Sequence, residues 1–457
     1  MAAQRGKPLP RTHPQAGNAL GALPACPRVL SVRGAPIEAS TPRVPRSCLA
    51  VALAALSLAA CGPAGFRGGV SPGALERAAN EPPTGAAGPG LERFDALIQN
   101  ILERSGIPGA SLAMARGGRL VLARGYGLAD VAAGERVQPQ TRFMLASVSK
   151  AITAVTVLKL VQEGRLSLDA TVLPFLPVAE PPADPRWHMI TVEMLLRHEG
   201  GWNRRTSGDP LTWNVRVARA LHVRRPVTPE QLARYMLGQP LDFTPGTEAV
   251  YSNFGYMLLG MMVERVAGAS YAEVVQSTTL IPMGITGLIN GAGRDERAYF
   301  PGEARRYGPD GRIAPGGLPP THFASGEWIG SSVDLVRFLT AVDGTRTAPF
   351  LSPALTDRML SPGPGGVGIH PNGGWFGLGW DDVQRRPDGV LFEKDGGLTG
   401  SMTWIEHDPS GVDWALFFNR TVSREVDQQA HREFIAGMRD AIATTTAWPD
   451  VDLFSRY

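Results

Sequence analysis

The stretch at residues 143–164, FMLASVSKAITAVTVLKLVQEG, constrains the fold more than any other part of the chain. A short strand-like lead-in runs into an apolar segment, in which Ile152 and Val155 begin a series of apolar residues at three-residue steps. Gly164 supplies a helix stop signal at its end. The pattern predicts a long buried helix with Ser147 at its first turn.

Ser147 and Lys150 form a Ser-x-x-Lys pattern at the start of this predicted helix. A serine at a helix N-terminus lies beside free backbone N–H donors and the positive end of the helix dipole. A lysine three residues later returns to the same face one turn on, so its amine can reach the hydroxyl. The pair indicates an activated nucleophile. The alternative is an N-cap serine followed by an exposed lysine.

Lysine is rare in this chain, which makes Lys150 more informative. Only four of the 45 basic residues are lysines, namely Lys7, Lys150, Lys159 and Lys394. Arginine keeps its proton in a protein, whereas a buried lysine can become neutral and act as a base. Two of the lysines lie in candidate motifs.

A second cluster, Tyr251-Ser252-Asn253, lies in a loop just before a predicted helix at residues 256–267. A tyrosine oxygen near a lysine ammonium is driven towards phenolate and can serve as a general base. The asparagine amide can orient a lysine and a substrate carbonyl. The alternative is a half-buried tyrosine with an asparagine that caps the next helix. His198, further upstream, is expected to pack near a turn.

A third cluster, Lys394-Asp395-Gly396-Gly397, is predicted at the start of the strand that precedes a hairpin. Glycines there let a substrate lie against the strand edge, and backbone N–H groups at that edge can donate to an oxyanion. The alternative is a hairpin turn with a solvated lysine.

Strands are predicted near both ends of the folded part, with helices between them. The predicted hairpins join residues 110–115 to 119–126 and residues 401–406 to 412–418; the other predicted helices cover residues 91–105, 191–197, 231–237, 332–342 and 425–443. The simplest closure is an α/β fold of the α+β type. It has one antiparallel sheet built from both chain ends and flanked by helices, plus a mainly helical lobe.

The first 90 residues are predicted to lie outside the folded domain, which is placed at residues 91–448. Residues 1–48 have the composition of a disordered or untranslated extension, and synthesis is expected to begin near Val44. Residues 43–61 resemble a bacterial lipoprotein signal that ends in Leu-Ala-Ala-Cys, which predicts lipidation of Cys61 and an extracytoplasmic protein anchored to the membrane, facing the periplasm or the cell exterior. An ordinary secretory signal is the alternative. Residues 62–90 are interpreted as a Gly/Pro/Ala linker.

Cysteine usage and charge exclude several kinds of site. The three cysteines are Cys26, Cys48 and Cys61, so the predicted domain has no disulfide, no thiol nucleophile and no cysteine metal site. The net charge is +3, and no basic cluster is interleaved with aromatic residues. We therefore expect no nucleic-acid partner.

The three clusters, in this order, resemble the serine β-lactamase and penicillin-binding-protein family, and most closely its class C β-lactamase-like serine hydrolases and esterases. The resemblance covers roughly residues 91–443 and includes GSSVDLVRFL at 330–339 and FGLGW at 376–380. It implies a β-lactamase/transpeptidase-like fold.

The resemblance also implies an acyl-enzyme mechanism without a metal or an organic cofactor. Ser147 would attack a carbonyl carbon, and Lys150 with Tyr251 would take its proton and pass it to the leaving group. Asn253 would hold Lys150 and the substrate. Lys394 would add positive potential that favours phenolate on Tyr251. Water would then release the acyl group.

The third motif departs from the family pattern at Asp395. The family usually has Lys-Thr-Gly or His-x-Gly there, and its threonine helps to bind a substrate carboxylate. Asp395, two residues after Glu393 and directly before Gly396, would repel such a group. The backbone N–H groups of Ser147 and Gly397 would still form the oxyanion hole. This favours a neutral ester or amide, or a substrate with an amine, over β-lactam or D-Ala-D-Ala cleavage.

Three functions follow as hypotheses. The first is an active serine hydrolase that cleaves esters or amides of small molecules or peptides. The second is a sensor or penicillin-binding protein that binds β-lactams or peptidoglycan peptides with little turnover. The third is a scaffold lipoprotein with a relic site, and the intact set of Ser147, Lys150, Tyr251, Asn253 and Lys394 argues against it.

Overall fold

The structure, a computed structural model, describes residues 71–457 except 178–179, 296, 347 and 422–423. The predicted lipidation site Cys61, the signal segment and the extension at residues 1–48 lie outside the described residues. Within the described part, no helix combines the length and the apolar character that a membrane crossing requires.

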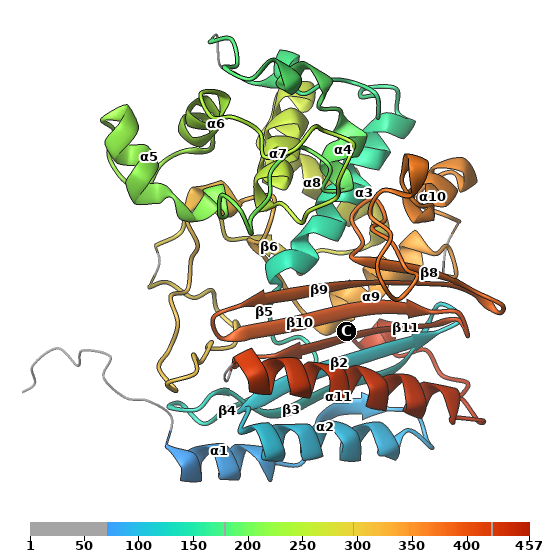
Figure 1. Cartoon of the computed structure of the whole chain (residues 1–457). Helices are drawn as coiled ribbons and strands as arrows, with labels where there is room; N and C mark the ends of the chain where they lie inside the picture. The colour runs from blue at the N-terminus through green and yellow to red at the C-terminus, as the bar shows by residue number, and fades with distance from the viewer. Residues whose placement is uncertain (1–70, 178–179, 296, 347, 422–423) are drawn as a thin grey trace, which may run out of the picture. The chain divides into compact units, whose positions relative to one another are not determined.

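One antiparallel sheet contains strands from both ends of the chain (Figure 1). Its strands run in the order β1-β3-β2-β11-β10-β9-β8, and a short strand, β4, pairs with β3. Both predicted hairpins, β2–β3 and β10–β11, are confirmed. The strand bounds are β1 Thr84–Ala87, β2 Gly109–Arg116, β3 Arg119–Asp130, β4 Glu135–Arg136, β8 Asp382–Arg386, β9 Gly389–Leu398, β10 Ser401–Asp408 and β11 Val412–Phe418.

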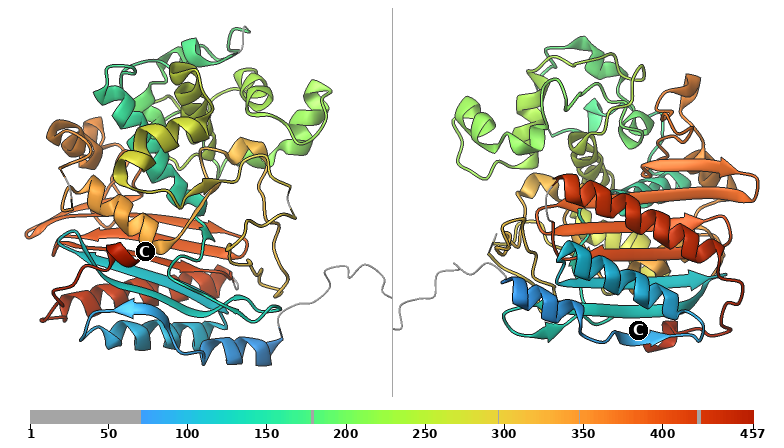
Figure 2. Two further views of the ribbon diagram at one scale, coloured as in Figure 1. Left: turned by 180° about the vertical axis from the view of Figure 1, so that it is seen from behind. Right: turned by 60° about the horizontal axis from the view of Figure 1, so that its bottom comes forward.

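Helices cover both faces of this sheet (Figure 2). Helices α2 (Glu92–Ser105) and α11 (Arg424–Ala443) lie on one face, and α9 (Ser332–Val342) lies on the other. Successive residues of a strand point to opposite faces, so Leu416 joins the core under α2 and α11 whereas Phe417 joins the core under α9. Because both faces are covered, all seven residues of β11 are buried.

The middle of the chain forms the predicted helical lobe above the sheet (Figure 1). Helix α3 (Ser149–Gln162) runs through it, and 11 of its 14 residues are buried, as expected for a helix that is apolar on nearly all sides. The other helices are α4 Val192–Leu196, α5 Asn214–Leu221, α6 Pro229–Leu237, α7 Asn253–Ala267, α8 Tyr271–Val275 and α10 Pro353–Leu360. A small sheet, β5-β7-β6 (Phe143–Met144, Trp328–Gly330 and Ile289–Asn290), holds the strand-like lead-in to α3.

The prediction of a linker over residues 62–90 is wrong for its described part, residues 71–90. Helix α1 (Pro72–Ala79) and strand β1 lie there, and β1 pairs with β3 at the edge of the main sheet. The strand sequence, TGAA, has no hydrophobic pattern that would predict a strand. Backbone pairing and a hydrogen bond from Thr84 Oγ1 to Val137 O at 2.6 Å hold it in place. The predicted domain end at 448 is also too early, because Phe454 is buried beneath the guanidinium group of Arg346.

Candidate active site

Ser147 lies in a single 3₁₀ turn, Ala146–Val148, that leads directly into α3. The residue before it, Ala146, has a φ of 47°, a left-handed conformation that an alanine rarely adopts. Flanking hydrogen bonds hold this turn, because Leu145 N donates to Trp328 O at 2.8 Å and Thr403 Oγ1 donates to Leu145 O at 2.8 Å. Strain of this kind, maintained by the surroundings, is typical of functional positions.

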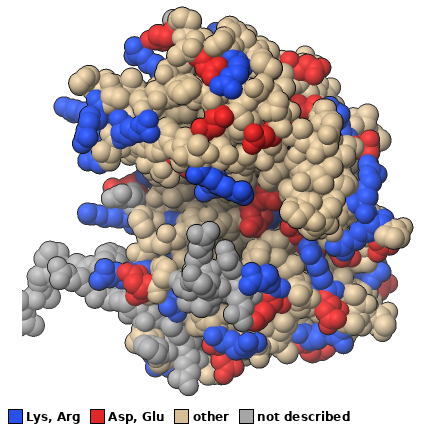
Figure 3. Space-filling model, viewed as in Figure 1, with Lys and Arg blue, Asp and Glu red and all other residues tan. Residues whose placement is uncertain are grey.

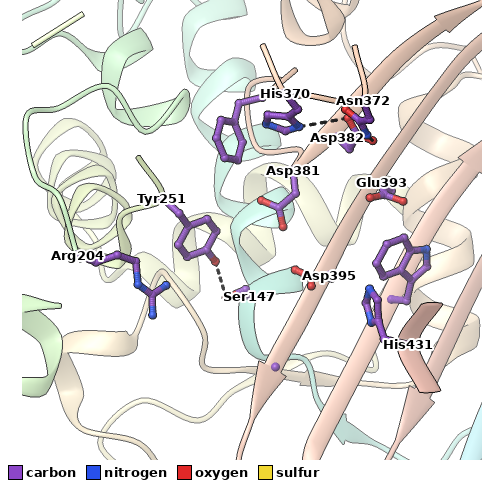
Figure 4. Close-up of a pocket in the computed structure, with 13 residues that line it drawn as sticks. Ser147, Arg204, Tyr251, His370, Asn372, Asp381, Asp382, Glu393, Asp395 and His431 are labelled. Carbon is purple, nitrogen blue, oxygen red and sulfur yellow. Dashed lines mark hydrogen bonds and ion pairs between the residues drawn. The ribbon is translucent and has the colours of Figure 1, made fainter. Parts of the chain in front are cut away.

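Two side chains converge on the Ser147 hydroxyl, and Figure 4 shows one of them, Tyr251, with its phenol directed at Ser147. Tyr251 OH donates to Ser147 Oγ at 2.6 Å, and Lys150 Nζ lies 3.0 Å from the same oxygen. Lys150 Nζ also donates to Ser325 O at 2.7 Å, which fixes the amine in place. The structure therefore brings together the three residues that sequence reasoning proposed as the reacting groups.

Burial sets the protonation of these groups. Desolvation lowers the pKa of the fully enclosed Lys150 amine well below its usual value, and the nearby ammonium of Lys394 lowers it further. Desolvation raises the pKa of the Tyr251 phenol well above its usual value, and the carboxylate of Asp381 adds to this. The site favours a neutral amine and a neutral phenol, not the phenolate that the sequence suggested.

Lys394 is buried inside β9, and not at its start as predicted. Its Nζ lies 4.9 Å from the centre of the Tyr251 ring, but it is also 2.5 Å from Asp381 Oδ1. This carboxylate offsets the potential that Lys394 would exert on the phenol. Asp381 is a site residue that sequence reasoning missed, although it directly follows the FGLGW stretch at 376–380.

Asp395 lies on the same strand and makes no ion pair with a basic side chain among the described residues. Burial raises the pKa of its carboxyl group to about 7, and the carboxylate of Asp381 contributes to the increase. Figure 4 shows Asp395 beside Ser147, with Asp381 and Glu393 further up in the view. Asp395 lines the same cavity as Ser147, and its influence on substrate charge stays a prediction.

Gly396 and Gly397 differ in what surrounds them. A Cβ added to Gly396 would lie 2.4 Å from both Leu145 O and Thr403 Oγ1, so only glycine lets β9 lie against the Ser147 turn. Gly396 is buried and serves this close approach. Gly397 has no atom within 4 Å of an added Cβ and lines the cavity with Ser147. The position of Gly397 suits an oxyanion donor, whereas that of Gly396 suits packing.

Asn253, at the start of α7, contacts a different partner from the one predicted. Its Nδ2 donates to Asp209 Oδ2 at 2.5 Å, and it makes no hydrogen bond to Lys150 among the described residues. Asp209 caps the short 3₁₀ helix Pro210–Thr212, and its charge partly opposes the fall in the pKa of Lys150. The predicted contact between Asn253 and the lysine is replaced by this anchor to the neighbouring loop.

His198 is buried against Tyr251, with 4.5 Å between the ring centres. Its Nδ1 accepts a hydrogen bond from Ser252 N at 3.1 Å, and burial lowers its pKa well below the usual value. The neutral ring therefore supports the loop that carries Tyr251. The expectation that His198 packs near a turn is confirmed, but its contact with a candidate reacting group was not foreseen.

A cavity of about 610 Å³ opens over Ser147. Four acidic residues lie on its wall, and Arg204 is the only lysine or arginine among the described lining residues. Figure 3 shows acidic side chains in the hollow between the two lobes. The lining residues are Ser147, Arg204, Tyr251, His370, Asn372, Phe376, Asp381, Asp382, Glu393, Asp395, Gly397, Trp404 and His431.

The chain matches one protein family model and resembles an esterase, a protein called flp and an amidase. The family model described as Beta-lactamase matches residues 94–437. Esterase EstB of Burkholderia gladioli is 30% identical over 316 residues, which cover 63% of this chain and 78% of the esterase. Protein flp of Staphylococcus aureus strain COL is 32% identical over 197 residues, which cover 43% of this chain and only 37% of flp.

A solved structure extends the comparison of the fold. D-amino acid amidase from Ochrobactrum anthropi SV3, complexed with L-phenylalanine amide, superposes with a TM-score of 0.62 and 20% identity. The match covers 78% of this chain and 99% of the amidase. At this identity the likeness establishes the shared fold. The family match over residues 94–437 confirms the predicted β-lactamase/transpeptidase-like fold, and the amidase superposes on this chain over nearly its whole length.

Proposed function

This chain belongs to the Beta-lactamase family of serine hydrolases, and on that premise we propose that it cleaves an ester or amide bond through an acyl-enzyme on Ser147. The observation that carries the proposal is the convergence of Lys150 Nζ and Tyr251 OH on one serine oxygen, at 3.0 Å and 2.6 Å. Two proton-transfer groups within hydrogen-bond reach of a hydroxyl are what its activation requires.

In the proposed mechanism Lys150 is the base and Tyr251 is the proton relay. The lone pair of Ser147 Oγ attacks the carbonyl carbon while the hydroxyl proton moves to the neutral Lys150 amine. The bond to the leaving group then breaks, and the leaving atom takes a proton from Tyr251 OH, which is restored from Lys150. Water then attacks the acyl-enzyme in the same way. Lys150 accepts a proton from the water, and Ser147 Oγ leaves with a proton from Tyr251 OH. The pKa shifts of the two groups support these roles.

Backbone donors complete the proposed site. The N–H groups of Ser147 and Gly397 would bind the oxyanion, and each is worth roughly 3 kcal/mol in comparable sites. Asn253 supports the base indirectly, through Asp209. Lys394 and Asp381 form an ion pair beside the phenol. The Lys394 amine lies 4.9 Å from the centre of the Tyr251 ring, and the ion pair adds little net charge there.

The wall of the cavity supports a substrate that is neutral or carries an amine. Lys394 pairs with Asp381, Arg439 with Glu393, and His370 lies 3.4 Å from Asp382, which leaves Asp395 without a basic partner in the described structure. EstB is named as an esterase, and the Ochrobactrum enzyme as an amidase. We propose uncharged esters or amides, or aminoacyl compounds, as the substrate class.

The proposal is tested by a screen of p-nitrophenyl esters, D-amino-acid amides and nitrocefin, together with a fluorophosphonate probe. We expect rapid labelling by the probe and steady release from at least one ester or amide. Labelling by a fluorescent penicillin that persists without product release would identify a sensor instead. If the probe does not label the protein and no substrate is cleaved, the proposal of a hydrolase is rejected.

The charge of Asp395 gives a prediction about specificity. Replacing Asp395 by threonine should lower the KM for carboxylate-bearing substrates about tenfold, because a like-charge contact is removed. The pKa of about 7 implies that Asp395 loses its charge as the pH falls through that value. Discrimination by the wild type should therefore weaken at acid pH, and Asp395→Thr should abolish this dependence. Neutral esters serve as the control, and an unchanged KM would contradict the prediction.

We also propose that the domain is tethered outside the cytoplasm by a lipid on Cys61, which the Leu-Ala-Ala-Cys signal supports. Mass analysis of the mature protein from a bacterial host should find a lipid-modified cysteine as its first residue. A mature chain that retains residues before Cys61 would contradict this.

A further inference from the structure

Three side chains outside the Ser147 cavity converge on one point between α9 and the β10–β11 hairpin. Asp343 directly follows α9, His407 lies on β10 and Asp413 lies on β11 as the cross-strand partner of His407. One ligand atom from each lies within 4.8 Å of the other two. The residues come from three elements and are close only in the folded chain.

The side chains are held with one oxygen or nitrogen atom of each facing this point. His407 Nδ1 lies 2.9 Å from Asp413 Oδ1 and 3.3 Å from Asp343 Oδ2. The backbone N–H and the hydroxyl of Thr345 donate to Asp343 Oδ1 at 2.8 Å and 2.7 Å, so Oδ2 is left for the cluster. The ring of Phe392 stacks on His407 at 4.8 Å and fixes its plane.

The cluster has buried acceptors that the described residues do not satisfy. Asp413 is fully buried, and its Oδ2 has no hydrogen-bond partner there; Asp343 Oδ2 likewise accepts no hydrogen bond. No lysine or arginine forms an ion pair with either carboxylate in the described structure. Even a protonated His407 would leave two carboxylates with one positive charge. Buried oxygens of this kind normally have a partner, because leaving them bare is costly.

We propose that Asp343, His407 and Asp413 bind a divalent zinc ion that joins α9 to the β10–β11 hairpin. A neutral imidazole, two carboxylates and one divalent ion sum to zero charge. Bonds of about 2.0 Å in tetrahedral geometry place ligand atoms roughly 3.3 Å apart, close to the spacing around His407 Nδ1. A mixed imidazole and carboxylate set suits zinc better than calcium or magnesium.

A route for the ion is also present. Asp343 lines a surface hollow of about 350 Å³, together with Thr356, Asp357 and Arg385. Arg385 is paired with Asp357 at 3.1 Å, so it does not occupy the cluster. The hollow gives access from solvent and room for a water molecule as the fourth ligand. The ion would have a structural role, since none of the three ligands lines the Ser147 cavity.

The test uses the purified full chain, stripped with a chelator, reloaded with zinc chloride and passed through a desalting column. We expect about one zinc per chain by mass spectrometry of the metal, and an unfolding temperature that zinc raises. His407→Asn keeps a hydrogen-bonding group near the Nδ1 position but removes the imidazole, and Asp343→Asn changes the ligand nearest the hollow. Both should lose the zinc and its thermal effect.

Two controls keep the outcomes distinct. Asp357→Asn removes a carboxylate from the same hollow, and His370→Asn removes the histidine beside Asp382, so each should retain full zinc binding. Cobalt should give the intense visible absorption of a tetrahedral site in the wild type and not in His407→Asn. The proposal would be overturned if the wild type bound no more zinc than a folded Asp343→Asn protein. The cluster would then be held by a proton on His407 and not by a metal ion.

Discussion

Replacing Ser147 by alanine should lower the kcat for ester hydrolysis by on the order of 10⁶-fold, because no other group can form the acyl-enzyme. Covalent labelling by a fluorophosphonate should disappear entirely. The rate that remains would reflect binding and the backbone donors alone, which still act on the substrate without a nucleophile. The measurement is single-turnover kinetics with a chromogenic ester, with mass spectrometry of the labelled chain.

Ser149→Ala provides a matched control for this change. Ser149 lies two residues further on and is buried. Its hydroxyl accepts a hydrogen bond from Trp328 N at 3.2 Å and forms none with the Lys150 amine or the Tyr251 phenol in the described structure. We expect it to be labelled at the wild-type rate. A folded Ser147→Ala protein that retained labelling or turnover would show that the acyl group is carried elsewhere.

The parts of the site that the sequence predicts are those encoded by short-range patterns. Ser147 and Lys150 are one helical turn apart, so helix geometry alone places the amine near the hydroxyl. The apolar series after Ser147 marked α3 as buried, and burial is what lowers the pKa of Lys150. The arrival of Tyr251 from 104 residues away rested on the family resemblance, since no local pattern encodes it.

The parts that were missed depend on contacts between distant segments. Asp381 reaches Lys394 because Asp381 N donates to Glu393 O at 3.0 Å, which holds the loop before β8 against β9. Asp209 acquires its role only when its loop meets α7 at Asn253. The pairing of Lys394 with Asp381 changes the expected electrostatics of Tyr251, because a lysine paired with a carboxylate no longer favours phenolate.

Edge strand β1 was missed for another reason. Its residues, Thr84–Ala87, are small, and they pair with Gly125, Arg124, Ala123 and Leu122 of β3 through the backbone. Backbone pairing at a sheet edge needs no alternation of apolar side chains, so the composition of a linker and that of this strand are the same. Whether this segment becomes a strand or a linker depends on the position of β3.

Replacing Lys150 by methionine should lower kcat by about 10³- to 10⁴-fold, because the general base is lost while the chain keeps a side chain of similar length. The same change should make the protein more stable. The pKa of Lys150 is depressed in the folded state, so the unfolded chain binds more protons, and wild-type stability rises with pH up to the usual lysine value of about 10.4. The gain from methionine should therefore be largest at low pH and vanish near that value.

Lys159→Met separates the two effects, since Lys159 lies in the last turn of the same helix, with its amine over the Phe350 ring and outside the cavity. It should leave kcat and the pH dependence of unfolding unchanged. Activity and stability then move in opposite directions at residue 150 alone, as expected when a buried amine is retained for chemistry at the expense of folding free energy. Denaturant unfolding of both variants across the pH range measures this. A Lys150→Met protein whose stability relative to the wild type does not fall as the pH rises would contradict the depressed pKa that the role of base requires.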